Sequence, residues 1–229
     1  MELLNQKKII FICVAVAAFF IICFLVVKIE RRIERQNIKA PEVKVTIPEG
    51  SKISDIINIV SVKLPNFNKK NFLLDAENKE GYLFPDTYFL FFSDDGSKAI
   101  QAMSDNFNIK IAPILPEINL SGHSEKDIIT MASIIEREAS GDKDRNIISG
   151  ILWKRLSKGM LLEVDAAPDT YKKAGLPTNP ICNPGLAAIE AAIHPESSPY
   201  LFYLHDKKGI VHYAQTFEEH QQNELIYLK

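Results

Sequence analysis

An unbroken apolar run near the N-terminus is the strongest pattern in the chain. Residues 9–27 are nineteen consecutive residues without a charge, a Pro or a Gly. A helix rising about 1.5 Å per residue over this run matches the thickness of a bilayer core. A buried core helix would show a polar face, and a cleavable signal peptide would have a shorter run before a small-x-small site. The run therefore predicts a transmembrane helix at residues 9–27, preceded by a short tail at residues 1–8.

A charged juxtamembrane linker at residues 28–42 leads into a small α+β module at residues 43–92. Apolar and polar residues alternate from Val43 to Ile47, as in a half-buried strand. The expected elements are a strand at residues 43–47, helices at residues 53–60 and 68–76, and an extended aromatic segment at residues 80–89. Two interpretations of the module stay open: a packing unit, or a glycan-binding LysM-like module.

The pattern in the remaining residues, 93–229, predicts a second domain of mixed α+β type. Its central helix begins at a capping box, Ser124-x-x-Asp127, ahead of an apolar run. The expected elements are helices at residues 96–111, 125–139 and 142–158, a helix that starts at Asn183-Pro184, a β-hairpin at residues 200–204 and 210–215, and a last helix capped by Thr216. The whole chain is thus expected to be an α+β protein with a single N-terminal span.

Charge divides the chain in the same way. The formal net charge is −2, but residues 1–40 hold seven Lys or Arg and three Asp or Glu, so they carry +4 and the rest carries −6. A balance this close to neutral argues against nucleic-acid binding, and the composition excludes collagen-like, disordered and disulfide-dense chains. Lys7 and Lys8 precede the apolar run and five Lys or Arg follow it. The positive-inside rule alone would therefore place the C-terminal side in the cytoplasm.

The chemistry-bearing residues favour a carboxylate site over a metal or cofactor site. The five His lack the spacing of a zinc site, and no P-loop, dinucleotide fingerprint or nucleophile elbow is present. Cys182 stands alone outside the apolar run and is more typical of a structural thiol than of a nucleophile. We therefore expect no metal and no cofactor.

Glu136 is the carboxylate best placed for acid catalysis of glycosidic cleavage. On the predicted helix at residues 125–139, it falls at the edge of an Ile/Met/Ala stripe, close to Ile129. Apolar surroundings raise the pKa of a carboxyl by desolvating its charged form, and an acid catalyst must stay protonated near neutral pH. On spacing alone, a solvated residue at the rim of an amphipathic helix is the more common interpretation.

The heptapeptide Ala132-Ser133-Ile134-Ile135-Glu136-Arg137-Glu138 resembles the catalytic signature of the MltG/YceG-like endolytic murein transglycosylases. Further blocks occur in the family's order over nearly the whole chain. They are Val45 to Gly50, Glu80 to Tyr88, Arg155-Leu156 with Gly159-Met160 and Leu162-x-x-Asp165, Gly175-Leu176-Pro177, Pro180 to Gly185, Ala191-Ala192 with His194-Pro195, and His212-Tyr213 with Glu219-His220. Several uncommon blocks in one order are more specific than any single one.

The resemblance implies a single-pass lytic transglycosylase in the bacterial inner (plasma) membrane. Residues 1–8 would lie in the cytoplasm and, against the Lys/Arg count, the C-terminal domain would face the cell wall. Members of the family cleave nascent peptidoglycan between N-acetylmuramic acid and N-acetylglucosamine and leave a 1,6-anhydro end. The family's catalytic Glu maps onto Glu136, which would protonate the leaving oxygen and then, as carboxylate, assist attack by the muramic 6-hydroxyl. The implied partners are peptidoglycan glycan strands and cell-wall synthesis proteins.

Six further residues are candidates for binding the substrate: Arg155, Asp165, Tyr171, Asn183, Gly185 and His212. For each, a structural turn or cap is an alternative interpretation. The segment between Asp165 and Gly175 is shorter than is usual in the family, which motivates a second hypothesis, a non-catalytic peptidoglycan-binding or scaffold protein. A third hypothesis is a glycan hydrolase, which would normally need a second carboxylate.

Overall fold

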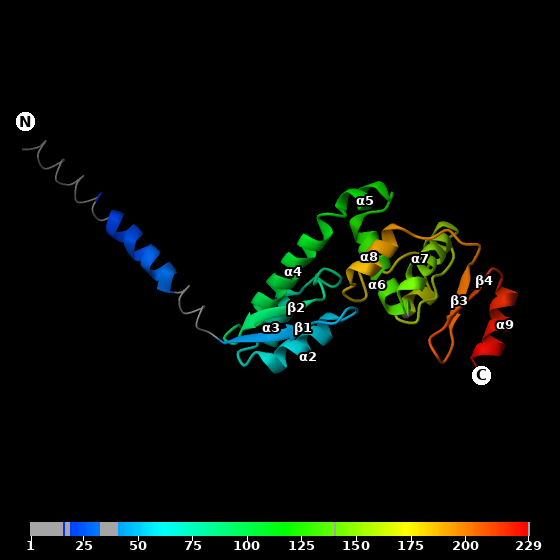
Figure 1. The fold of residues 1–229 in the computed structure, drawn as a ribbon, viewed down its shortest axis with the longest axis horizontal. Helices are drawn as coiled ribbons and strands as arrows, with labels where there is room; N and C mark the ends of the chain where they lie inside the picture. The colour runs from blue at the N-terminus through cyan, green and yellow to red at the C-terminus, as the bar shows by residue number, and fades with distance from the viewer. Residues whose placement is uncertain (1–15, 17–18, 33–40, 140, 229) are drawn as a thin grey trace, which may run out of the picture.

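A computed structural model of the chain describes residue 16 and residues 19–32, 41–139 and 141–228. Residues 19–32 form a helix (Figure 1), and its large apolar side chains are exposed. Within the part of the chain that the structure describes, no helix combines the length and the hydropathy of a membrane span. Much of the predicted span at residues 9–27, and all of the tail at residues 1–8, lies outside the described residues. The span therefore stays a prediction.

The first module is a two-stranded sheet with two helices. Along the chain it consists of β1 (Glu42–Thr46), α2 (Ile53–Lys63), α3 (Lys69–Asp75) and β2 (Thr87–Phe91). The strands pair antiparallel, with Val45 opposite Tyr88. Val45 and Leu90 join Ile56 and Phe72 in one hydrophobic core. The strand and both helices predicted from the alternation and spacing are confirmed, and the end of the aromatic segment forms the partner strand.

One helix, α4 (Ser97–Ile111), is shared by two hydrophobic cores. Its first half contributes Ala99, Ile100 and Met103 to the core of the first module. Its second half contributes Phe107 and Ile111 to a second core. The domain boundary expected after residue 92 is thus followed at once by a helix that packs against both units.

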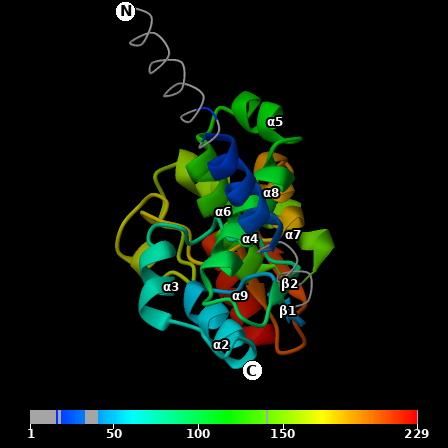
Figure 2. The ribbon, with the colours of Figure 1, turned by 90° about the vertical axis from the view of Figure 1, so that its left-hand side faces the viewer.

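A short helix, α5 (Leu115–Leu120), has no counterpart among the elements expected from the sequence. Prolines around its start are typical of a chain break, yet Pro116 lies in the first turn, where backbone N–H groups are unpaired in any helix. Ile118 anchors α5 in the second core. In both views of the molecule, α5 lies on the side opposite α2 and α3 (Figures 1 and 2).

Three helices, α6 (Glu125–Glu138), α7 (Asp142–Ser157) and α8 (Leu186–Ile193), build the second core. Every residue of α6 from Ile128 to Ile135 is buried, because α5, α7 and α8 all pack against it. The periodicity predicted a single buried stripe, so the helix is more enclosed than expected. The helices predicted at residues 125–139 and 142–158 are confirmed.

Helix α8 begins later than the sequence predicted. The pair Asn183-Pro184 predicts a helix start in the order of cap and first-turn Pro, but the helix begins only after Gly185, which is its N-cap. The backbone of Asn183 is engaged elsewhere. Its N–H donates to the carbonyl of Ser51 and its carbonyl accepts from the N–H of Gly50. These bonds tie the segment to the first module and delay the helix.

The C-terminal part is an antiparallel hairpin covered by one helix. The hairpin consists of β3 (Phe202–His205) and β4 (Val211–Ala214), and α9 (Phe217–Tyr227) packs on both strands. Thr216 caps α9 by accepting a hydrogen bond from the N–H of Glu219. The predicted hairpin and capped helix are confirmed. A short 3-10 turn, η1 (Pro168–Tyr171), lies in the long segment between α7 and α8.

Candidate active site

Glu136 lies in the last turn of α6, the helix at the centre of the second core. The start of this helix is fixed by a capping box, in which Ser124 accepts from the N–H of Asp127 and the carboxylate of Asp127 accepts from the N–H of Ser124. The side chain of Glu136 is only 8% exposed. The interpretation as a solvated rim residue is therefore wrong, because the helix is enclosed beyond its apolar stripe.

The carboxyl of Glu136 has one close hydrogen-bond donor and a weak ion pair. The N–H of Gly185 donates to Oε2 at 2.9 Å, and Nη2 of Arg145 lies 3.8 Å from Oε1. Burial raises the pKa of Glu136, and the negative charge of Glu49 adds to this effect. The Gly185 hydrogen bond and the charges of Arg145 and Arg137 oppose it without cancelling it. The carboxyl thus keeps its proton to higher pH than an ordinary Glu, as a general acid requires.

The turn between β1 and α2 brings the first module against this carboxyl. Gly50 in this turn has φ +73°, a conformation that favours glycine. A Cβ placed on Gly50 would meet Cγ of Glu136 at 3.5 Å. A Cβ placed on Gly185 would overlap the carboxylate of Glu49. Glu49 and Glu136 therefore both lie against Gly185, although they come from different modules.

Asn183 is fully buried and joins the two modules through its side chain. Its Oδ1 accepts hydrogen bonds from the N–H groups of Gly81 and Leu83, each at 2.9 Å. Its Nδ2 donates to the carbonyl of Ser51 and to Oε1 of Glu80, each at 2.9 Å. Because all four bonds of the amide are made within the protein, the structure gives Asn183 a framework role behind Gly185.

A second group of candidate residues lines a separate cavity of about 470 Å³ beside α6. Arg155, Asp165 and Tyr171 line it together with Glu138 and Tyr203. The hydroxyl of Tyr171 donates to Oδ1 of Asp165 at 2.6 Å, and that of Tyr203 donates to Oε2 of Glu138 at 3.0 Å. Burial raises the pKa of Glu138, and the charge of Asp165 adds to this effect. Glu136 and Glu138 are thus two enclosed carboxyls in different surroundings.

Arg155 and His212 are occupied by contacts within the protein. Arg155 is 5% exposed, and it donates to the carbonyls of Leu201 and Leu162, each at 2.8 Å. His212 lies on β4, where its Nε2 is 3.3 Å from Oδ2 of Asp206 and its ring stacks on Tyr227 at 3.5 Å between centroids. His212 is not brought to Glu136, and it does not line the cavity beside Glu138.

Cys182 precedes the bridging residue and is also buried. Its thiol donates to the carbonyl of Ser133 at 3.2 Å, and burial raises its pKa to about 12. A thiol in this state is not a nucleophile near neutral pH. Across the described residues, no three His, Cys, Asp or Glu side chains are grouped as metal ligands would be.

Glu49 and Arg145 belong to the site, and sequence reasoning missed both. Glu49 stands in a block that the resemblance already included, but a block match does not say which other segment it contacts. Arg145 lies on the first part of α7 and is separated from Glu136 by the helix junction. The signal for both residues is spatial, because it depends on how the turn and α7 dock on the end of α6.

The YceG-like family model matches residues 26–168 and 169–225 of the chain. The endolytic murein transglycosylase of Bacillus subtilis is 33% identical over 174 residues, which cover 65% of this chain and 48% of that protein. The endolytic murein transglycosylase of Streptococcus pneumoniae D39 is 28% identical over 172 residues, which cover 63% of this chain and 31% of that protein. The chain therefore matches half or less of the length of these curated relatives.

The fold agrees with a solved structure as well. The crystal structure of a yceG-like protein from Listeria monocytogenes is similar with a TM-score of 0.72 and 30% identity, covering 85% of this chain and 80% of that chain. This likeness supports the mixed α+β architecture. Because the family model extends over nearly all of the sequence and the solved relative shares the fold, we conclude that this chain belongs to the YceG-like family.

Proposed function

We propose that the chain is an endolytic lytic transglycosylase, a lyase that cuts peptidoglycan between N-acetylmuramic acid and N-acetylglucosamine and leaves a 1,6-anhydro end. The enclosed carboxyl of Glu136, with its raised pKa, is the observation that carries this proposal. The names of the curated relatives support it. No cofactor or metal enters the mechanism.

The proposed reaction uses one carboxyl in two protonation states. Glu136 in its acid form gives its proton to the glycosidic oxygen that leaves. The resulting carboxylate keeps the Gly185 hydrogen bond, and then takes the proton of the muramic 6-hydroxyl as that oxygen attacks the anomeric carbon. The attacking group belongs to the substrate, so no second carboxylate is needed to activate water, in contrast to a hydrolase.

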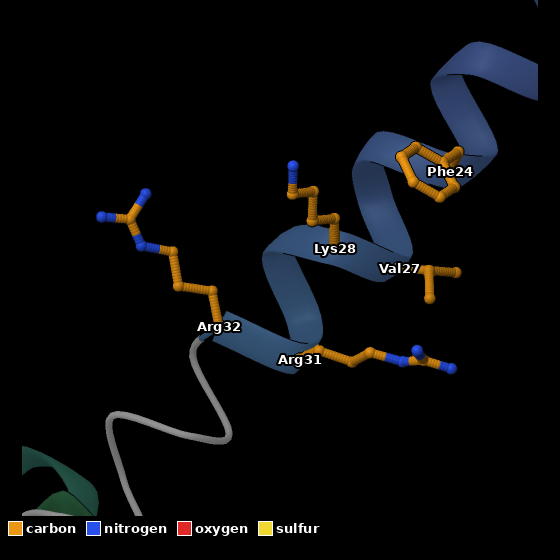
Figure 3. A pocket seen from close by; sticks show the side chains of 5 residues that line it. All are labelled: Phe24, Val27, Lys28, Arg31 and Arg32. Carbon is orange, nitrogen blue, oxygen red and sulfur yellow. The ribbon is translucent and has the colours of Figure 1, made fainter.

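We further propose that residues 9–27 anchor the protein in the bacterial inner membrane, with the C-terminal domain facing the cell wall. The helix at residues 19–32 supports this, because its large apolar side chains are exposed. Figure 3 shows the end of this helix, where the apolar residues Phe24 and Val27 are followed by the cationic residues Lys28, Arg31 and Arg32. Such a change from apolar to cationic residues is typical of a helix that leaves a bilayer. The orientation rests on where the substrate occurs, since the Lys/Arg count favours the opposite one.

The first module is proposed to be a LysM-like unit that holds the glycan strand beside the site. Its order of strand, helix, helix and strand supports this, as does the contact of its turn with Glu136. Asp165 and Tyr171 are proposed to meet the strand in the cavity beside α6, which Arg155 and Glu138 also line. Proteins of cell-wall synthesis are the proposed partners.

The test is product analysis with the full-length chain in mild detergent. Uncrosslinked glycan strands are incubated with the wild-type protein and with Glu136→Gln, in water labelled with oxygen-18, and the products are analysed by mass spectrometry. We expect unlabelled 1,6-anhydro ends from the wild-type protein and none from Glu136→Gln, because an amide is too weak an acid to protonate the leaving oxygen. The matched control is Glu125→Gln, which changes an exposed Glu on the same helix and should keep full activity.

Two other results would point to different functions. Reducing ends that carry the label would show a hydrolase and contradict the lytic mechanism. Strand binding without any product would show a non-catalytic wall-binding or scaffold protein, a candidate favoured by the short segment between Asp165 and Gly175. Anhydro ends released at the wild-type rate by Glu136→Gln would remove Glu136 from its proposed role.

A further inference from the structure

We infer that Glu49, which belongs to the first module, is a positioning residue for Glu136: its charge, placed against Gly185, keeps Glu136 in the acid form with which the reaction begins. This inference deepens the proposed function and rests on it. The proposed glycan-holding role of the first module does not require it.

Gly185 donates its N–H to Oε2 of Glu136 at 2.9 Å, and the carboxylate of Glu49 fills the space where a side chain of Gly185 would stand. The backbone of Gly185 has φ −77° and ψ 170°, which any residue adopts. A side chain at position 185 would therefore displace the carboxylate of Glu49, whereas the backbone conformation at that position would accept any residue.

The position of Glu49 is fixed by the backbone around it. The N–H of Gly50 donates to the carbonyl of Asn183 at 2.9 Å, and the N–H of Asn183 donates to the carbonyl of Ser51 at 3.0 Å. These two bonds join the turn to the segment that leads into Gly185. The backbone beside Glu49 is thus held against the segment that leads into Gly185, although the side chain of Glu49 is exposed.

In the part of the chain that the structure describes, no group donates a hydrogen bond to the carboxylate of Glu49, and no cation pairs with it. Its charge is therefore not paired with a neighbouring cation, and it raises the pKa of Glu136. A carboxylate that served only to hold the turn would be expected to have a donor from the turn or from α2.

Three charged groups and one thiol lie within electrostatic reach of Glu136. Glu49 approaches from the turn after β1, Arg145 from α7 and Arg137 from α6 itself. The thiol of Cys182, in the segment before α8, is also within electrostatic reach of Glu136 but is neutral near neutral pH. The two arginines favour the ionised form of Glu136, and Glu49 is the charge that opposes them. Without Glu49, burial alone would raise the pKa of Glu136, and the two arginines and the Gly185 hydrogen bond would lower it.

The sign of the effect follows from the role of the acid. Activity of a general acid falls as pH rises through its pKa, because the proton is lost before it can be transferred. Removing the charge of Glu49 lowers the pKa of Glu136, so this fall should begin at a lower pH. At a pH well below the pKa of Glu136 in both the wild-type protein and the variant without the Glu49 charge, Glu136 is protonated in each. The two rates should then agree.

The experiment is a pH–rate profile of the full-length protein on glycan strands, for wild type, Glu49→Gln and Glu49→Asp. Glu49→Gln should move the alkaline limb of kcat/KM to lower pH, giving a several-fold loss at neutral pH and a wild-type rate at acidic pH. Glu49→Asp keeps the negative charge, so the alkaline limb of its kcat/KM profile should lie close to that of the wild-type protein. The control is Glu42→Gln, which removes an exposed charge from β1 of the same module and should leave the profile unchanged.

A second measurement separates this inference from the proposed function. The titration of Glu136 is followed by NMR of glutamate labelled at the side-chain carboxyl carbon, with Glu136→Gln to assign the signal. A lower titration midpoint in Glu49→Gln supports the coupling even if the wild-type protein releases no product, in which case the function alone fails. An unchanged midpoint, or a rate lowered equally at every pH, would overturn the inference and leave Glu49 a structural residue of the turn.

Discussion

Asn183 has a wholly polar side chain, and no part of it is exposed. Its amide oxygen accepts hydrogen bonds from the N–H groups of Gly81 and Leu83. Its amide nitrogen donates to the carbonyl of Ser51 and to the carboxyl of Glu80. A buried polar residue of this kind stabilises only while all of its bonds are made, because each group left alone costs its full desolvation.

Replacing Asn183 by Ala should therefore destabilise the protein by about 3 kcal/mol, since several buried donors and acceptors lose their partner at once. The measurement is the free energy of unfolding from urea denaturation. Asn179→Ala is the matched control, because Asn179 is an exposed residue of the same segment and should change stability little. Equal stability of the two variants would contradict the framework role of Asn183.

Among single residues, Glu136 was singled out from the sequence by the family resemblance, and its place at the edge of an apolar stripe alone favoured a solvated rim residue. The structure shows that its side chain is enclosed, and its catalytic role stays a prediction. The partners of Asn183 lie 100 to 132 residues away along the chain, and the contact of Glu49 with Gly185 spans a comparable distance. No local pattern encodes such contacts, so a cap was an equally good prediction for Asn183.

Among the elements, α6 holds the enclosed carboxyl of Glu136 at one end and a capping box at the other. Ser124→Ala should cost about 1 kcal/mol of stability, because the N–H of Asp127 loses its acceptor at the start of the helix. The free energy of unfolding measures this loss. Ser61→Ala is a suitable control, because Ser61 lies inside α2 and its hydroxyl donates only to the carbonyl of Asn58 in the same helix. A loss at Ser61 as large as that at Ser124 would argue against capping as the cause.

The elements themselves were largely predictable because their signals are local. Helical spacing and caps placed α2, α4, α6, α7 and α9 close to their observed bounds. The errors arose where tertiary contacts override local preference. Helix α8 starts late because Asn183 bonds to the first module, and α5 forms despite its prolines because Ile118 is buried in the second core.

Over the whole molecule, the two hydrophobic cores are joined by α4 and by the hydrogen bonds of Asn183. We expect them to unfold together. Met103→Ala in the first core should lower stability by about 2–5 kcal/mol, and the fluorescence of Trp153, which packs on the second core, should report the full loss. Val62→Ala, at a position 83% exposed, is the control.

A fluorescence transition that stays at the wild-type midpoint in Met103→Ala would show two independently unfolding units. The relative placement of the units was the part of the fold that could not be predicted from the sequence. Periodicity describes how each element buries its own apolar face, but it does not state which two faces meet. The boundary expected after residue 92 reflects this, because α4 belongs to both cores.

The bridge at Asn183 also determines when the candidate site can assemble during synthesis of the chain. On a growing chain, α6 and Glu136 are complete long before residues 183–185 have been made. Until then Glu136 lacks the Gly185 donor, and the turn with Glu49 has nothing to dock against. Contacts that close over such sequence distances form late in folding. A chain still on the ribosome, or one truncated before α8, would therefore carry Glu136 in an unassembled site, and the proposed activity would require the finished fold.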